Sequence, residues 1–411
     1  MANVNVTNQI IARESAAILE EEAPFLANVN RDYDKEFAKS VNGFNVGDNI
    51  DIRVPPIGIV FDGPVFAGGA GGTLFTGTGT PADSVETKVN LKLDIWKHIA
   101  LAFGTKERAL EIEDFRERIL RPQVQTLSSW LEAEFIKRAV QATPNWVGTA
   151  GTIPTTMKTY AQARAKLENN LTPPGGRTML FSSDANVELV DSSKVLFHAD
   201  TQINKMFITG TLGEAQAAMW YEHQSIPTIA TGTQASFTIN GASQTGSSLA
   251  IGGLTAANTL LKGTKFTIAN VFDVHPQTGA TLQNKLKQFT ITADFTAAGT
   301  TGTISIYPAI NPTVNKNVSA SPTNGAAATL FAGASASVTQ NLMYHKNAFA
   351  VAVAPMEKIV GADSEVVTLK NGISVRVTTF GDGVNSKNGT RIDVLAGFAA
   401  PRGHQACVIL Q

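Results

Sequence analysis

The amino-acid sequence predicts an α+β chain, built from a long helix, an extended hairpin before it and an inserted all-β domain after it. The helix is indicated by Phe115–Ala142, where apolar residues recur every three or four positions between Leu120 and Ala139. The hairpin is indicated by two stretches that alternate apolar and polar residues. The insert is indicated by a change of composition near Ala230.

Composition limits the function classes. The chain has 411 residues, enough for two or three domains, and only 16% are charged while 43% are apolar. A net charge of -1 provides no global attraction to nucleic acid or to an anionic membrane. The single cysteine, Cys407, excludes an internal disulfide framework. We expect no signal peptide and no membrane span, because neither a basic start with an apolar run nor an apolar stretch of about 18 residues is present.

The N-terminal third begins with a helix and continues as a hairpin. Residues 8–22 have a helical apolar pattern that Pro24 ends, which is typical of a packing arm. Strands are predicted at Ile50–Val54 and Val85–Leu93, with the glycine-rich run Gly63–Thr80 between them. A two-stranded hairpin is marginally stable alone, so we expect it to rest on a neighbouring element.

The long helix follows a charged segment, Thr105–Asp114. Pro122 either occupies the first turn of the main helix or marks a bend in a longer one. A second helix is predicted at Lys158–Leu171, with Leu171 on its apolar face. Further predicted elements are a strand at Thr178–Phe181, a helix at Ser183–Val190 capped by Ser183 or Asp184, and a helix at Leu212–His223.

The insert is rich in threonine, alanine and glycine. Between Thr231 and Tyr344 the charged residues are five lysines and two aspartates, with no glutamate and no arginine. Its alternating stretches predict a small barrel or sandwich, with strands at Phe266–Val271, Phe289–Ala293 and Thr303–Tyr307. After it we predict strands at Ala348–Val353 and Ile373–Phe380, and a closing antiparallel pair made of Arg391–Ala399 and Ala406–Leu410.

No catalytic, cofactor-binding or metal-binding residue is predicted. The sequence contains no phosphate-binding loop, nucleophile elbow or paired cysteine motif. Glu222 with His223, and Asp273 with His275, lack a third ligand at metal spacing. The carboxylates around the charged segment are explained by ion pairs with nearby lysines and arginines, and Cys407 by burial in an apolar strand. The four tryptophans are not interleaved with basic residues, so nucleic-acid stacking is not indicated. We expect no enzyme and no cofactor.

The order of these parts resembles the major capsid protein of tailed bacteriophages with the Hong Kong 97-type fold. It looks most like the coat proteins of Salmonella-type short-tailed phages, which carry an insertion domain. Three stretches are most similar. Lys262–Ala269 with His275–Thr292 and Gly302–Tyr307 resembles the insertion-domain strands, Asn341–Met356 resembles the return into the main fold, and Thr390–Ile409 resembles the closing strands.

The resemblance implies a set of domains: 1–43 an N-terminal arm, 44–104 an extended hairpin loop, 105–157 a peripheral domain with the spine helix, 158–232 the first part of an axial domain, 233–344 the inserted β-domain, and 345–411 the second axial part with strands returning to the peripheral domain. It implies a homo-oligomer in pentons and hexons, a scaffolding protein and a portal as partners, and enclosure of double-stranded DNA without sequence-specific binding. It places the protein in the virion, assembled in the bacterial cytoplasm through a procapsid that expands.

The chain departs from that pattern at two places. The stretch that corresponds to an acidic loop of the related insertion domains, Phe237–Leu260, carries no charge, which argues against a salt-bridged two-fold contact. Residues 54–87 contain no lysine, which argues against covalent cross-linking through the hairpin. Three alternatives stay open: another phage structural protein such as a tail tube or decoration protein, an enzyme with an unrecognised site, and a ligand-binding barrel.

Overall fold

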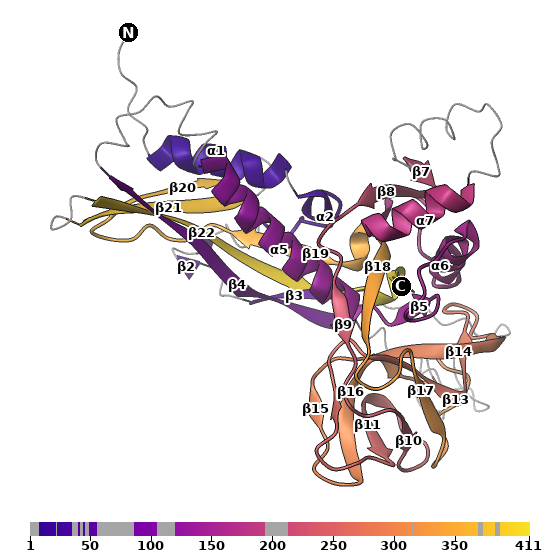
Figure 1. Cartoon of the computed structure of the whole chain (residues 1–411). Coiled ribbons are helices and arrows are strands. Elements are labelled where there is room, and N and C mark those ends of the chain that lie inside the picture. The colour runs from indigo at the N-terminus through magenta and orange to yellow at the C-terminus, as the bar shows by residue number, and fades with distance from the viewer. Residues whose placement is uncertain are drawn as a thin grey trace, which may run out of the picture.

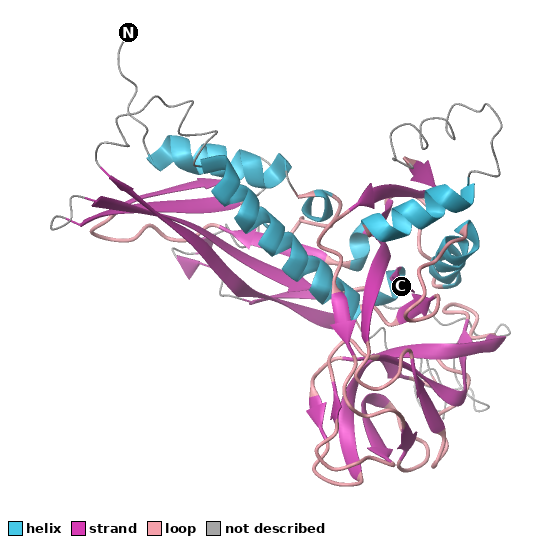
Figure 2. Cartoon of the chain, viewed as in Figure 1, coloured by secondary structure: helices cyan, strands magenta, loops and turns pink. Residues whose placement is uncertain are grey.

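The computed structural model describes residues 8–21, 23–34, 40–41, 44–45, 49–55, 86–104, 120–193, 213–313, 316–368, 373–382 and 387–411. The chain folds into two open sheets with helices against them and a closed β-barrel (Figures 1 and 2). The mixed α and β character and the barrel that the sequence predicts are confirmed. The glycine-rich run Gly63–Thr80, the charged segment Thr105–Asp114 and residues 115–119 of the predicted long helix lie outside the described residues.

The first sheet is a long plate in the strand order β20-β21-β22-β4-β3, with β19 also paired to β22. The strands are β3 (Asn49–Val54), β4 (Thr87–Gly104), β19 (Ala350–Ala354), β20 (Asp363–Thr368), β21 (Ser374–Asp382) and β22 (Lys387–Ala399). β3 and β4 form the predicted antiparallel hairpin. β4 then continues along β22 from Lys92 to Gly104, so the hairpin has its third strand within the same chain.

Two helices cover one face of this plate, as Figure 1 shows. They are α1 (Asn8–Glu21) and α5 (Arg121–Ala142), and the short helix α2 (Pro24–Ala27) lies beside them. The covering helices bury Ile11 and Leu19 of α1 and Val124 of α5 in one cluster with Val377 and Val394 of the sheet. Pro122 stands in the first turn of α5, as one of the two sequence interpretations proposes.

The second sheet runs β5-β23-β18-β6-β8-β7, with β9 also paired to β18. Its strands are β5 (Asn145–Val147), β6 (Arg177–Phe181), β7 (Glu214–Ala215), β8 (Ala218–Glu222), β9 (Thr228–Ala230), β18 (Ser337–His345) and β23 (Ala406–Leu410). Helices α6 (Met157–Asn169) and α7 (Ser183–Ser193) pack with it around the buried side chains of Tyr160, Leu189 and Trp220.

Several local predictions are wrong in this region. Leu212–His223 was expected to be a helix, but its described part forms β7 and β8, because burial alternates from Ala218 to Glu222. Leu171 has a left-handed backbone (φ 55°) just after α6 and is 41% exposed instead of buried. The cap of α7 is Ser182, whose Oγ accepts the Ala185 N–H at 3.2 Å, and not one of the two residues after it.

The closing strand pair is also a correction. Arg391–Ala399 belongs to β22 in the first sheet, whereas β23 pairs with β18 and β5 in the second. Pro401 and the short 3-10 helix Gly403–Gln405 separate the two strands and carry the chain from one sheet to the other. The two strands that look like partners in the sequence therefore connect the two sheets.

The barrel closes in the order β10-β11-β16-β14-β13-β17. Its strands are β10 (Phe237–Ile239), β11 (Gly246–Gly252), β13 (Lys265–Val274), β14 (Thr281–Ile291), β16 (Thr301–Ile310) and β17 (Ala327–Leu330), with the small pair β12 (Thr259–Leu260) and β15 (Phe295–Thr296) beside it. In its core Phe266 stacks on Phe289 and meets Phe237 edge to face. The chain reaches the barrel through β9 and leaves it through β18, and these two strands pair antiparallel. Two further short strands, β1 (Ser40–Val41) and β2 (Phe44–Asn45), pair with each other.

Candidate functional site

The residues with possible chemistry lie apart from one another and mostly in ion pairs. Among the described residues, no group of three or more His, Cys, Asp or Glu side chains is placed to hold a metal ion. His223 contacts Glu132, while the neighbouring Glu222 accepts the side-chain N–H of Asn186 at 2.8 Å. Asp94 binds Arg138 at 2.9 Å. Burial raises the pKa of the Cys407 thiol to about 12, which leaves it an inert thiol.

Where the barrel meets the rest of the chain, the structure places a dense set of polar contacts, which we call the barrel joint. Its members come from the C-terminal end of α5, from β5 and α6, and from β13 and β14 of the barrel. They are Val140, Gln141, Trp146, Lys166, Lys265, Asp273, Lys287, Gln288 and Thr290.

Lys265 is the most buried charged group of the barrel joint. Its Nζ donates to the Val140 carbonyl at 3.2 Å, to the Gly263 carbonyl at 3.3 Å and to Gln340 Oε1 at 2.7 Å. The Val140 carbonyl lies in the last turn of α5 and also accepts the backbone N–H of Thr143 at 3.3 Å. Burial lowers the pKa of the Lys265 ammonium from 10.5 to about 7. Lys265 thus binds the barrel to the last turn of α5 and to β18.

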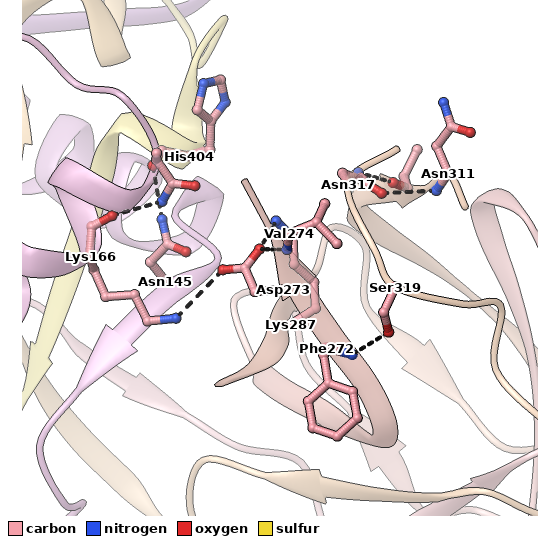
Figure 3. Close-up of polar contacts among 12 residues, drawn as sticks. Asn145, Lys166, Phe272, Asp273, Val274, Lys287, Asn311, Asn317, Ser319 and His404 are labelled. Atoms are coloured by element: carbon pink, nitrogen blue, oxygen red, sulfur yellow. Dashed lines mark hydrogen bonds and ion pairs between the residues drawn. The ribbon is translucent and has the colours of Figure 1, made fainter. Parts of the chain in front are cut away.

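A second ionic contact lies at the other side of the joint. Figure 3 shows Asp273 of β13 with Lys166 of α6 on one side and Lys287 of β14 on the other. The Asp273 carboxylate is 2.8 Å from Lys287 Nζ and 3.9 Å from Lys166 Nζ. Burial lowers the pKa of Lys166 in spite of the nearby Asp273 charge. Asp273, which the sequence placed beside His275, therefore ties the barrel to α6.

The backbone of β5 and of the segment before β13 also takes part in the barrel joint. Gln288 accepts the Trp146 N–H at 3.1 Å and donates to the Trp146 carbonyl at 2.9 Å, as an extra strand would. Gly263 has a left-handed φ of 88°, and a Cβ there would lie 2.8 Å from Gln141 Cγ. Sequence patterns do not reveal this joint, because its contacts between the barrel and α5, β5 or α6 join residues more than 100 positions apart. Each of these residues alone looks like an ordinary surface residue.

A second group of contacts joins α2, α5 and His223, the residue that follows β8. Glu132 of α5 is 2% exposed, and its Oε1 accepts the backbone N–H groups of Phe25 at 2.8 Å and of Leu26 at 3.4 Å. Its Oε2 contacts His223 Nε2. His223 Nδ1 accepts the Ser225 N–H at 3.0 Å, so the proton of this imidazole is on Nε2 and points at the carboxylate. One buried carboxylate therefore holds three segments together.

The large exposed apolar side chains are the remaining feature that suggests contact with other molecules. One group belongs to the first sheet and the loop before β20, a second to the turn after α6, to α7 and to β8, and Trp130 belongs to α5. They are Trp96, Ile359, Val360 and Phe380 in the first group and Leu171, Val187 and Met219 in the second. Scattered exposed apolar residues are normal on monomers, but side chains such as Val360, which is 99% exposed, fit surfaces that are buried on assembly.

Comparison with known proteins gives one strong result. Residues 75–411 match the family described as "P22 coat protein - gene protein 5". No curated protein matches the chain. Described residues contain no helix with both the length and the apolar character that a membrane crossing requires.

Solved structures with a similar chain path include several from bacteriophages, at low sequence identity. For Mycobacterium phage Che8 the identity is 13%, the TM-score is 0.46, and the match covers 94% of this chain and 90% of that one. For the mature capsid of bacteriophage PhiM1 the values are 10%, 0.43, 88% and 82%. For the capsid of cyanophage P-SCSP1u they are 11%, 0.42, 89% and 83%.

Proposed function

Because the chain belongs to the P22 coat protein family, we infer that it is a major capsid protein, and its copies form the head shell of a bacteriophage. The protein is a component of the virion. The observation that carries this conclusion is the family match, which spans most of the chain from residue 75 to its end. The family is a structural one, and the barrel joint and the Glu132 contacts serve to hold a shape.

For the architecture, we propose the Hong Kong 97-type arrangement with an insertion domain like that of Salmonella-type coat proteins. In this proposal α5 is the spine helix, the β3–β4 hairpin begins the extended loop, and the barrel is the insertion domain. The proposal is supported by the long helix across a sheet, by the hairpin that continues into that sheet, and by the paired strands β9 and β18 that lead to the barrel. The domain limits are those implied by the sequence, with the arm at 1–43 and the insert at 233–344.

For the assembly, we propose pentons and hexons of this one chain, built with a scaffolding protein and a portal, around double-stranded DNA. The shell would form in the bacterial cytoplasm as a procapsid and then expand. A net charge of -1 is consistent with a shell that encloses DNA without sequence-specific binding. In this scheme the arm and the extended loop move during expansion, and the contacts of Glu132 with α2 are among those that would have to break.

Electron microscopy of the purified full-length chain tests the function. Closed shells or polyheads are the expected products, alone or with a scaffolding protein. Tubes or small rings would instead favour the alternative, a tail tube or decoration protein. A compact monomer at every concentration, measured by sedimentation, would contradict both structural functions.

A further inference from the structure

The face of the first sheet that points away from α1 and α5 carries an unusual group of side chains, which we call the Trp96 cluster. It consists of Trp96 on β4, Arg376 on β21, and Arg391 and Asp393 on β22. Residues alternate between the two faces of a strand, and Val375, Val377 and Val394 pack against the helices, so the cluster lies on the opposite face.

Asp393 is the centre of the cluster and has no exposed surface. Its Oδ1 accepts Trp96 Nε1–H at 3.1 Å and Arg391 Nε–H at 2.7 Å. Its Oδ2 accepts from Arg376 Nη2 at 3.1 Å. Both guanidinium groups lie against the Trp96 ring, 5.9 Å from its centroid for Arg376 and 5.7 Å for Arg391. Two arginines and one aspartate give the cluster a net charge of +1.

The side chains of the Trp96 cluster are fixed in place, but some of their hydrogen-bond donors have no partner among the described residues. The side chain of Arg376 is 8% exposed, and its Nε is buried with no hydrogen-bond partner. Arg391 uses only Nε, so its two terminal nitrogens have no partner among the described residues. The Trp96 side of the cluster is open, because this residue is 55% exposed. A guanidinium that is fixed at Nε and stacked on an indole presents its terminal N–H groups as a fork, which matches a carboxylate.

Arg376 also ties the loop between β19 and β20 to the cluster, since its Nη1 donates to the Glu357 carbonyl at 2.9 Å. That loop carries Ile359 and Val360, which are 41% and 99% exposed. Exposed aromatic and aliphatic side chains thus belong to the cluster and to the loop that Arg376 holds, so a segment with a carboxylate next to an apolar side chain fits this surface.

The chain itself offers such a segment. On α7, Val187 is 67% exposed and is flanked by Asp184 and Glu188, neither of which has an ion-pair partner among the described residues. The helix contains no basic residue. A surface of charge +1 with an open aromatic ring and an acidic surface with an open aliphatic residue are complementary. A second copy of the chain thus carries the chemistry that the cluster would recognise.

We propose that the Trp96 cluster is an interface at which a second copy of this chain docks, with a carboxylate on the terminal nitrogens of Arg391 and an apolar side chain on Trp96. The proposal rests on the function as a shell protein, in which other copies of the same chain are the surrounding surfaces.

Site-specific photo-cross-linking in assembled particles tests the proposal. A benzoylphenylalanine replaces Trp96, or in a second variant His98, which lies on the same face of β4 opposite Asp393. After irradiation, denaturing gels should show covalent dimers of the chain, and mass spectrometry should place the second end of the link in an acidic segment of another copy. A link to a different protein, or particles that form without any intermolecular link from either position, would overturn the proposal while leaving the shell function intact.

Substitution of the fork provides an independent measurement. Arg391→Lys keeps the charge but loses the planar pair of donors and the Nε contact with Asp393, so we expect about a tenfold lower particle yield per folded subunit, with the melting temperature of each free variant measured beside it. Arg53→Lys is the matched control, because Arg53 is exposed and its distance to Glu86 is 3.6 Å. Equal yields for the two variants would contradict the assigned role of Arg391. Failure of the wild-type chain to form shells would instead refute the shell function itself.

Discussion

Replacing Lys265 by methionine should remove a measurable part of the pH dependence of folding stability. The ammonium is fully buried in the barrel joint, and burial lowers its pKa from 10.5 to about 7. Methionine has a similar length and no titration. Between pH 7 and pH 10.5 the unfolded chain holds a proton on Lys265 that the folded chain has mostly lost. The stability of the wild-type protein should therefore rise with pH in this window, and the contribution should be lost as pH falls toward 7.

The magnitude follows from one proton. A full difference of one bound proton changes the free energy of unfolding by about 1.4 kcal/mol per pH unit. From pH 7.5 to pH 9.5 the wild-type protein should thus gain roughly 2 kcal/mol relative to Lys265→Met, because other titrating groups cancel in the comparison. The variant also lacks the hydrogen bonds of Lys265 Nζ, which lowers its stability at every pH, so only the change of the difference with pH tests the titration.

Urea unfolding of the free full-length subunit, followed by circular dichroism at several pH values, measures this quantity. Lys262→Met is the matched control, since Lys262 is an exposed lysine three positions away. The difference between wild type and Lys262→Met should be flat across the same pH range. A difference between wild type and Lys265→Met that is also flat would refute the argument that this buried ammonium titrates near neutral pH.

Three further outcomes are expected. Glu132→Gln should destabilise the subunit by about 1–3 kcal/mol in urea unfolding and speed hydrogen exchange at the Phe25 and Leu26 amides, because the side-chain amide of glutamine cannot accept from both α2 and His223. The control Glu134→Gln, at a partly exposed i,i+4 pair, should change stability by less than about 0.5 kcal/mol. Equal effects of the two substitutions would contradict the role of Glu132. Gly263→Ala should lower the free energy of unfolding by about 1–3 kcal/mol, because Gly263 has a left-handed backbone and lies close to Gln141. Gly333→Ala should be nearly neutral, because no atom lies within 4 Å of a new Cβ there. Similar melting temperatures for the two variants would refute the close fit of the barrel joint. Mature particles boiled in detergent should migrate as monomers, since residues 54–87 contain no lysine, and a ladder of covalent oligomers would show that cross-linking occurs elsewhere in the chain.

Local periodicity was enough to predict the elements whose neighbours are close in sequence. The apolar spacing of α6 predicted the burial of Tyr160 and Leu167, and alternation predicted β3 and the start of β4. Local periodicity failed where contacts with distant parts of the chain determine the secondary structure or the strand partner. The segment at Ala218–Glu222 is short, and only its pairing with β6 settles it as a strand. β22 and β23 are both apolar and adjacent, but each finds partners from distant parts of the chain.

The interaction sites were harder to predict than the fold, because each is made of one residue from each of several segments. Glu132 looks like an ordinary polar position of an amphipathic helix until α2 and His223 are placed against it. The same holds for Asp393, whose three donors come from three strands. A single sequence contains no signal for such long-range pairs.

The barrel has its own apolar core, separate from the cluster that joins α1 and α5 to the first sheet. Its attachment is different in kind, since the barrel joint consists largely of buried ions and hydrogen bonds such as those of Lys265 and Asp273. Buried polar contacts add little net stability compared with apolar packing, but they tolerate few alternative geometries. Their main effect is therefore on orientation. A shell needs every copy to present the barrel at the same angle to α5, because a small error at the joint becomes a large displacement at the far end of the barrel. The ionic and hydrogen-bonded barrel joint thus suits a subunit in which the angle between the barrel and α5 must be fixed.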